Sequence, residues 1–75
     1  MADTRRLDLK LKRIKAIEGS YRSIIKRAED EYKHNLITRD KLSKIRRKHT
    51  QKIEKLQIKA RRLQKLRMRL KTRNA

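Results

Sequence analysis

The sequence predicts an all-α protein, a hairpin of two long antiparallel amphipathic helices that could complete a bundle by dimerisation. Three observations lead to this prediction. The 75-residue chain has no Pro, Trp or Phe and a single Gly, so the residues typical of strands and tight hairpins are scarce. Its apolar residues recur every three or four positions in two runs. A short segment, residues 35–38, separates the runs, and the length allows one domain over residues 1–75.

The first helix is predicted over roughly residues 4–34. In heptad terms the a positions are Leu7, Ile14, Tyr21 and Ala28, the d positions are Ile17 and Ile24, and the e positions are Leu11, Ile25 and Tyr32. This pattern predicts one continuous apolar face. Asp3 or Thr4 is expected as the N-cap, because either side chain can accept a hydrogen bond from a free amide of the first turn.

Gly19 is the weak point of this helix, since glycine in a helix interior costs about 1 kcal/mol relative to alanine. We expect the helix to continue, because the heptad pattern runs from Ile14 to Tyr21 without a shift. The alternatives are a kink, close approach of another backbone, or a break that would leave three helices with Ser20 as a cap.

The linking segment carries stop and start signals. Asn35 is the best candidate for a left-handed residue that closes the first helix. Thr38 is expected to cap the second helix, with Asp40 in its first turn, where the helix dipole favours a negative charge. Ile37 and Leu42 occupy the two positions of a hydrophobic staple.

The second helix is predicted over roughly residues 39–73. Its apolar stripe consists of Leu42, Ile45, His49, Ile53, Leu56, Ala60, Leu63, Leu66 and Leu70. Two helices joined by a short turn usually fold back antiparallel. The alternative is one long, interrupted helix that pairs with another chain.

The composition also sets limits on stability. Charged residues make up 45% of the chain, and the net charge is +18. Low hydrophobicity with high charge is typical of disorder, but the apolar periodicity argues against disorder for most of this chain. An isolated hairpin would be marginal, and self-repulsion would weaken it further. We therefore expect a homodimer or neighbouring protein on the apolar stripe, or a polyanion, to complete the structure.

The positive charge is concentrated toward the second half of the sequence. Residues 1–38 carry ten bases and six acids, whereas residues 39–75 carry sixteen bases and two acids, none of them after Glu54. A hairpin would place this basic C-terminal segment beside the basic start of the first helix and form a positive pole. The predicted phosphate-binding residues are Arg5, Arg6, Lys12, Arg13, Arg46, Arg47, Lys55, Lys59, Arg61, Arg62, Lys65, Arg67, Arg69, Lys71 and Arg73.

No set of residues suggests catalysis, and we predict neither an enzyme nor a cofactor. His34 and His49 are the only histidines and there is no Cys, so the usual metal-ligand spacings are absent. We expect His34 to be solvated at the turn and His49 to be partly buried on the apolar stripe. Tyr21 and Tyr32 are expected in the core, which would leave no stacking platform for unpaired bases.

These features predict a nucleic-acid-binding protein that contacts the phosphate backbone without strong sequence specificity, in the cytosol and associated with the ribosome or the nucleoid. Size, paired-helix pattern and charge resemble those of small helical ribosomal proteins, which favours RNA and a place in a ribonucleoprotein. Three alternatives are an architectural duplex-DNA-binding protein, a coiled-coil subunit with an acidic protein partner, and an amphipathic helix at a membrane surface. Membrane and small-molecule partners are not expected: the chain lacks interfacial Trp and Phe, and no run of apolar residues could span a bilayer.

Overall fold

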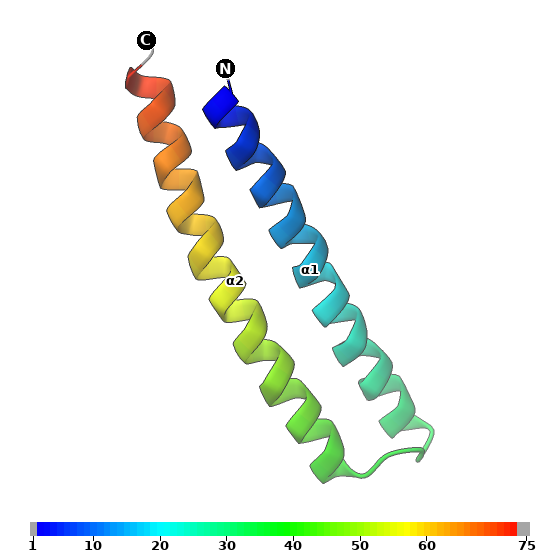
Figure 1. Cartoon of the computed structure of the whole chain (residues 1–75). Coiled ribbons are helices and arrows are strands. Elements are labelled where there is room, and N and C mark those ends of the chain that lie inside the picture. The colour runs from blue at the N-terminus through cyan, green and yellow to red at the C-terminus, as the bar shows by residue number, and fades with distance from the viewer. Residues whose placement is uncertain (1, 74–75) are drawn as a thin grey trace.

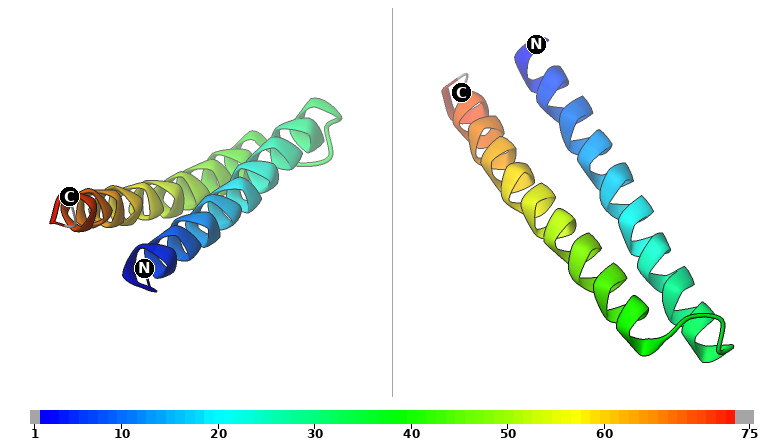
Figure 2. Two further views of the ribbon diagram at one scale, coloured as in Figure 1. Left: turned by 90° about the horizontal axis from the view of Figure 1, so that it is seen from above. Right: turned by 60° about the horizontal axis from the view of Figure 1, so that its bottom comes forward.

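The computed structural model describes residues 2–73, with side chains described for residues 4–71. It contains two helices, α1 (Ala2–Lys33) and α2 (Arg39–Arg73), and no strand in this part of the chain. The helices run antiparallel and bring the two chain ends to the same end of the molecule (Figure 1). They lie side by side along a narrow rod that extends 57 × 15 × 12 Å (Figure 2). The predicted helical hairpin is therefore confirmed.

The start of α1 differs from the prediction. The helix begins at Ala2, so Asp3 and Thr4 have helical backbone and the predicted N-cap is wrong. The side chain of Asp3 lies outside the described residues. Alanine is the best helix former, and an acidic residue in the first turn suits the helix dipole, so the sequence can continue the helix toward its N-terminus.

Helix α1 passes through Gly19 without a break, as predicted. No described glycine has a positive φ. The hydroxyl of Ser20 donates a hydrogen bond to the carbonyl oxygen of Ala16, at 3.1 Å, and so bonds back onto its own helix rather than capping a new one. The three-helix alternative is excluded.

A Schellman motif closes α1. Asn35 has a φ of 59°, the only positive value among described non-glycine residues. The amide of Asn35 donates to the carbonyl of Tyr32 at 3.0 Å, and the amide of Leu36 donates to that of Glu31 at 2.9 Å. The hydrophobic contact that often accompanies this motif is weak here, because Leu36 is 72% exposed.

Thr38 caps α2 as predicted. Its hydroxyl oxygen accepts a hydrogen bond from the amide of Lys41 at 3.2 Å, and its carbonyl accepts the first helical bond from Leu42 at 3.0 Å. Asp40 lies in the first turn. Leu42 is buried and Ile37 half-buried, as the two ends of a hydrophobic staple would be.

The interhelical seam differs from the prediction in which side chains are buried between the two helices. Only Leu7, Ile14, Ala28, Leu42 and Ile53 are buried. In α1 the a and e positions face the partner helix, whereas the d residues Ile17 and Ile24 are each 43% exposed. Tyr32 and Leu66 are also exposed, so the expectation that these four side chains lie in the core is wrong. A seam of a and e positions turns the d positions toward solvent, because each residue rotates the helix by about 100°.

Candidate nucleic-acid interface

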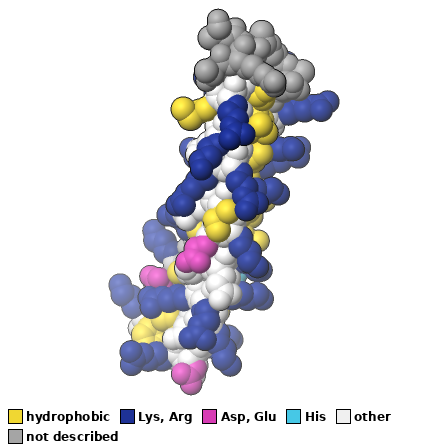
Figure 3. Space-filling model, turned by 90° about the vertical axis from the view of Figure 1, so that its left-hand side faces the viewer, with side chains coloured by type: hydrophobic (Ala, Val, Ile, Leu, Met, Phe, Trp, Pro, Cys, Tyr) yellow, Lys and Arg dark blue, Asp and Glu magenta, His cyan; other side chains and the backbone are white. Residues whose placement is uncertain are grey.

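The structure describes fourteen of the fifteen predicted phosphate-binding side chains, and only that of Arg73 lies outside the described residues. Thirteen are exposed and Arg67 is half-buried. The hairpin sets the first turns of α1 beside the last turns of α2, so basic segments from both ends of the sequence share one end of the rod (Figure 1). On the face seen in Figure 3, the half toward the chain ends shows Lys and Arg, and acidic side chains occur only in the other half.

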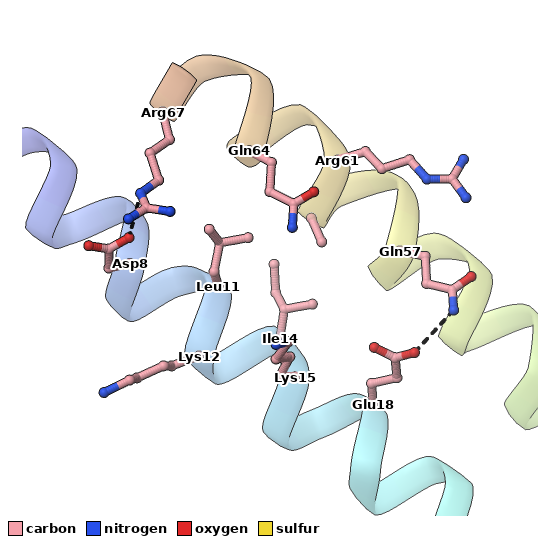
Figure 4. A pocket seen from close by; sticks show the side chains of 11 residues that line it. Asp8, Leu11, Lys12, Ile14, Lys15, Glu18, Gln57, Arg61, Gln64 and Arg67 are labelled. Atoms are coloured by element: carbon pink, nitrogen blue, oxygen red, sulfur yellow. Dashed lines mark hydrogen bonds and ion pairs between the residues drawn. The ribbon is translucent and has the colours of Figure 1, made fainter. Parts of the chain in front are cut away.

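Polar contacts between the helices lie along one side of the rod, which we call the groove face. A groove on this face has a volume of about 650 Å³ and includes Asp8, Glu18, Gln57 and Arg67 in its lining (Figure 4). At one end, the Nε atom of Arg67 lies 2.8 Å from Oδ1 of Asp8. This buried nitrogen is not aligned for a hydrogen bond, so the contact is an ion pair only.

Glu18 is the centre of a second contact on the groove face. Its Oε1 atom accepts hydrogen bonds from Arg22, at 2.7 Å, and from Gln57 across the seam, at 3.1 Å. The hydrogen bond from Arg22, followed by that from Gln57, lowers the pKa of the Glu18 carboxyl below its ordinary value. The carboxylate of Glu18 therefore links α1 to α2 through Gln57, while its negative charge is paired with Arg22 in its own helix.

A third interhelical contact pairs Arg46 with Glu29 at 3.3 Å. Glu29 follows Asp8 by 21 residues and Arg67 follows Arg46 by 21, so both ion pairs use the same heptad positions. Two of the predicted phosphate-binding residues, Arg46 and Arg67, thus form ion pairs with acidic residues of α1. Lys12 and Arg61 line the groove without an ion pair among the described residues.

The two histidines lie where the sequence predicts. His49 is half-buried, with its Nδ1 atom 2.8 Å from the carbonyl oxygen of Ile45 and its ring centroid 5.7 Å from that of Tyr21. The Nζ atom of Lys52 lies 5.4 Å from the centroid of the same tyrosine ring, within cation–π range. His34 is exposed at the turn, and its Nδ1 atom lies 2.8 Å from the carbonyl oxygen of Asp30.

Sequence reasoning missed several residues of this surface. Gln57 was not singled out, because only its position opposite Glu18 reveals its role. Lys41, Lys48 and Lys52 were left out of the predicted set, although each is exposed on α2. The available signal was their spacing: Lys41 and Lys48 belong to a row of cations that repeats every seven residues.

Among residues 4–71, no group of three or more His, Cys, Asp and Glu side chains converges as metal ligands would. Neither helix, over its described length, has an apolar segment that could cross a bilayer. No protein family, curated protein or solved structure matches this chain. The functional argument therefore depends on the geometry and charge of the hairpin itself.

Proposed function

We propose that this chain is a non-enzymatic nucleic-acid-binding protein that contacts the sugar-phosphate backbone without strong sequence specificity. The observation that carries the proposal is uncompensated positive charge along an extended helical hairpin. The net charge is +18, and within residues 4–71 only Arg22, Arg27, Arg46 and Arg67 among the Lys and Arg side chains form ion pairs. The remaining cations are solvated and available to displace counterions from a polyanion.

RNA is favoured over duplex DNA, and a ribonucleoprotein such as the ribosome over chromatin, on the resemblance in size, helical pattern and charge to small helical ribosomal proteins. A narrow rod with cations around it can fit between two RNA helices and reduce their mutual repulsion. Such a partner would place the protein in the cytosol, at the ribosome or the nucleoid.

The test is a titration of the purified protein against folded RNA, duplex DNA and anionic vesicles at several salt concentrations. Phosphate binding predicts that log K falls linearly with log[salt], with a slope of about −0.9 per contacted phosphate on B-DNA. Binding that does not depend on salt would contradict the proposal. Mild lysis followed by identification of the co-purifying nucleic acid would then separate ribosomal RNA from chromosomal DNA.

A second candidate is a coiled-coil subunit that binds an acidic protein. The exposed Ile17 and Ile24, 43% each, favour it, because both lie at d positions beside the seam, where a further helix could cover them. Sedimentation of the free protein would distinguish a self-associating subunit from a monomer.

A further inference from the structure

We infer that the nucleic acid binds along one side of α2, on a basic stripe formed by Lys41, Lys48, Lys52, Lys55, Lys59, Arg62 and Arg69, and that its occupant is the backbone of a double helix. This inference rests on the proposed function and adds to it the binding face and the form of the partner. It replaces a positive pole, which spreads around the end of the rod, by a surface that follows its length.

The groove face fixes the direction of the stripe. Gln57 points into the groove toward Glu18 (Figure 4). Lys55 and Lys59 lie two residues before and after Gln57, and two residues rotate an α-helix by about 200°. These lysines therefore lie on the side opposite the groove. The same relation holds for Arg62, two residues before the groove-lining Gln64.

Heptad repetition extends this side along the helix. Lys41, Lys48, Lys55, Arg62 and Arg69 follow one another every seven residues, and Lys52 and Lys59 occupy the adjoining row with Ile45 and Leu66. All seven cations are exposed. Lys41 and Arg69 are 28 residue steps apart along the helix, so the stripe is roughly 42 Å long at 1.5 Å per residue.

No acid interrupts the stripe on α2. Asp40 and Glu54 each lie one residue before a stripe position, about 100° around the helix from it and toward the groove face. Within the described part of the chain, none of the seven cations forms an ion pair, and Lys52 alone has a partner, the ring of Tyr21. On the groove face, by contrast, Arg22, Arg46 and Arg67 are neutralised by Glu18, Glu29 and Asp8. Phosphate contacts on the stripe would break no ion pair.

Helix α1 contributes to the same side near the chain ends. Arg6 and Lys10 lie two residues before and after Asp8, which is on the groove face, and Arg13 lies two residues before the groove-lining Lys15. By the rotation argument, all three cations are on the stripe side. The exposed Ile17 and Ile24 continue the row of Lys10. Among the side chains of residues 4–71, this side of α1 is therefore cationic and apolar except for Glu31, which is paired with Arg27 at 3.6 Å.

Length and stiffness favour a double helix as the occupant. The stripe is longer than one turn of duplex, roughly 34–36 Å. A straight helix holds its cations at fixed intervals, and a duplex likewise holds its phosphates in place, so both partners lose little conformational freedom. Single strands are usually held by aromatic stacking. The described aromatic residues do not offer it on the stripe, because Tyr21 is half-buried in the seam and the exposed Tyr32 lies beside Glu29 and Arg46 on the groove face.

Two triple variants with the same change in charge test the stripe. The stripe variant combines Lys48→Gln, Lys55→Gln and Arg62→Gln, and the control combines Lys12→Gln, Lys15→Gln and Arg61→Gln on the groove face. The affinity for a B-form DNA duplex of roughly 21 base pairs, which is two helical turns, is measured at several salt concentrations. We expect the stripe variant to lose about 2.7 from the magnitude of the salt slope, 0.9 for each lost contact, and the control to lose less than about 1. Circular dichroism checks that helicity is unchanged.

The outcomes separate this inference from the proposed function. If the unmodified protein shows no salt-dependent binding to RNA or DNA, the proposed function itself fails. If it binds but the two variants lose equal slope, or the control loses more, the function stands and the stripe is wrong. Binding to a single strand as tight as to the duplex would overturn the double-helical occupant. Stripe-dependent binding that is tighter for polyglutamate or for anionic vesicles than for duplex would overturn it in favour of a protein or membrane partner.

Discussion

Replacing Gly19 by alanine should stabilise the hairpin. Gly19 lies in the interior of α1 and has no positive φ, so alanine can adopt its backbone conformation. A Cβ atom built at this position meets nothing within 4 Å. The substitution therefore removes conformational freedom from the unfolded chain without a steric cost, and we expect a gain of about 1 kcal/mol in the free energy of unfolding.

Thermal and urea unfolding followed by far-ultraviolet circular dichroism measure this gain. For a domain of this size, 1 kcal/mol corresponds to a rise of about 4–8 °C in Tm. Ala16→Gly is the matched control: Ala16 is exposed in the same helix, and its carbonyl, which accepts the bond from Ser20, is retained. It should lower the stability by a similar amount.

A Gly19→Ala variant that is less stable than the parent protein would refute the reasoning. It would mean that the helix bends at Gly19 or that another backbone packs there, as in an oligomer. Binding adds a second check. Gly19 lies four residues after Lys15, a groove-lining residue, and one turn along the same side of α1. Because this side is away from the basic stripe, duplex affinity should be unchanged by the added methyl group.

Three further expectations concern the forces that hold the hairpin together. Ile53→Ala should cost about 2–4 kcal/mol, since Ile53 is 8% exposed, whereas Ile58→Ala, at a site 50% exposed, should change stability by less than about 1 kcal/mol in urea unfolding. Because the pKa of Glu18 is lowered, the contribution of its carboxylate to the free energy of unfolding is complete above pH 4.5 and is lost as the pH falls through the lowered pKa. In the Glu18→Gln variant, this part of the loss of stability in acid should disappear. Added sodium chloride should raise the Tm of the free protein, because it screens the repulsion of a +18 chain, and a fall would argue that surface ion pairs dominate.

The turn and the helix ends beside it could be predicted closely, because their signals are local. Asn35 adopts the left-handed conformation, and Thr38 caps α2 through the amide of Lys41, both as side-chain chemistry requires. The first turn of α1 was harder to place. Ala2 favours helix, while Asp3 and Thr4 can either cap a helix or lie inside its first turn, so the residue types alone do not decide where it begins.

The seam was predicted less well than the helices, because heptad spacing identifies the apolar face of a helix but does not determine which rows at its edges contact the other helix. Either d or e positions can join the a positions of α1 in contact with α2. The structure selects e, which half-buries Glu18 against Gln57 and leaves the isoleucines at the d positions exposed. Pairing of Asp8 with Arg67 and of Glu29 with Arg46 is consistent with this choice, because both acids lie next to the e row.

The position of the seam changes the interpretation of how the positive charge is distributed over the hairpin. Counted along the sequence, the cations gather after Glu54 and predict a pole. Counted around α2 from the position of Gln57, the same helix has a side on which every position is cationic or apolar, and that side continues past Glu54 to Lys41. The acids of α2 lie off this side, and the described acids of α1, within residues 4–71, either pair with groove-face arginines or lie near the turn. One face of the hairpin thus carries the interhelical ion pairs that stabilise the antiparallel pairing, while the seven stripe cations on the other face form no ion pair within residues 4–71. A single basic helix without a partner could not make this division, since its acids would have no second helix to bind.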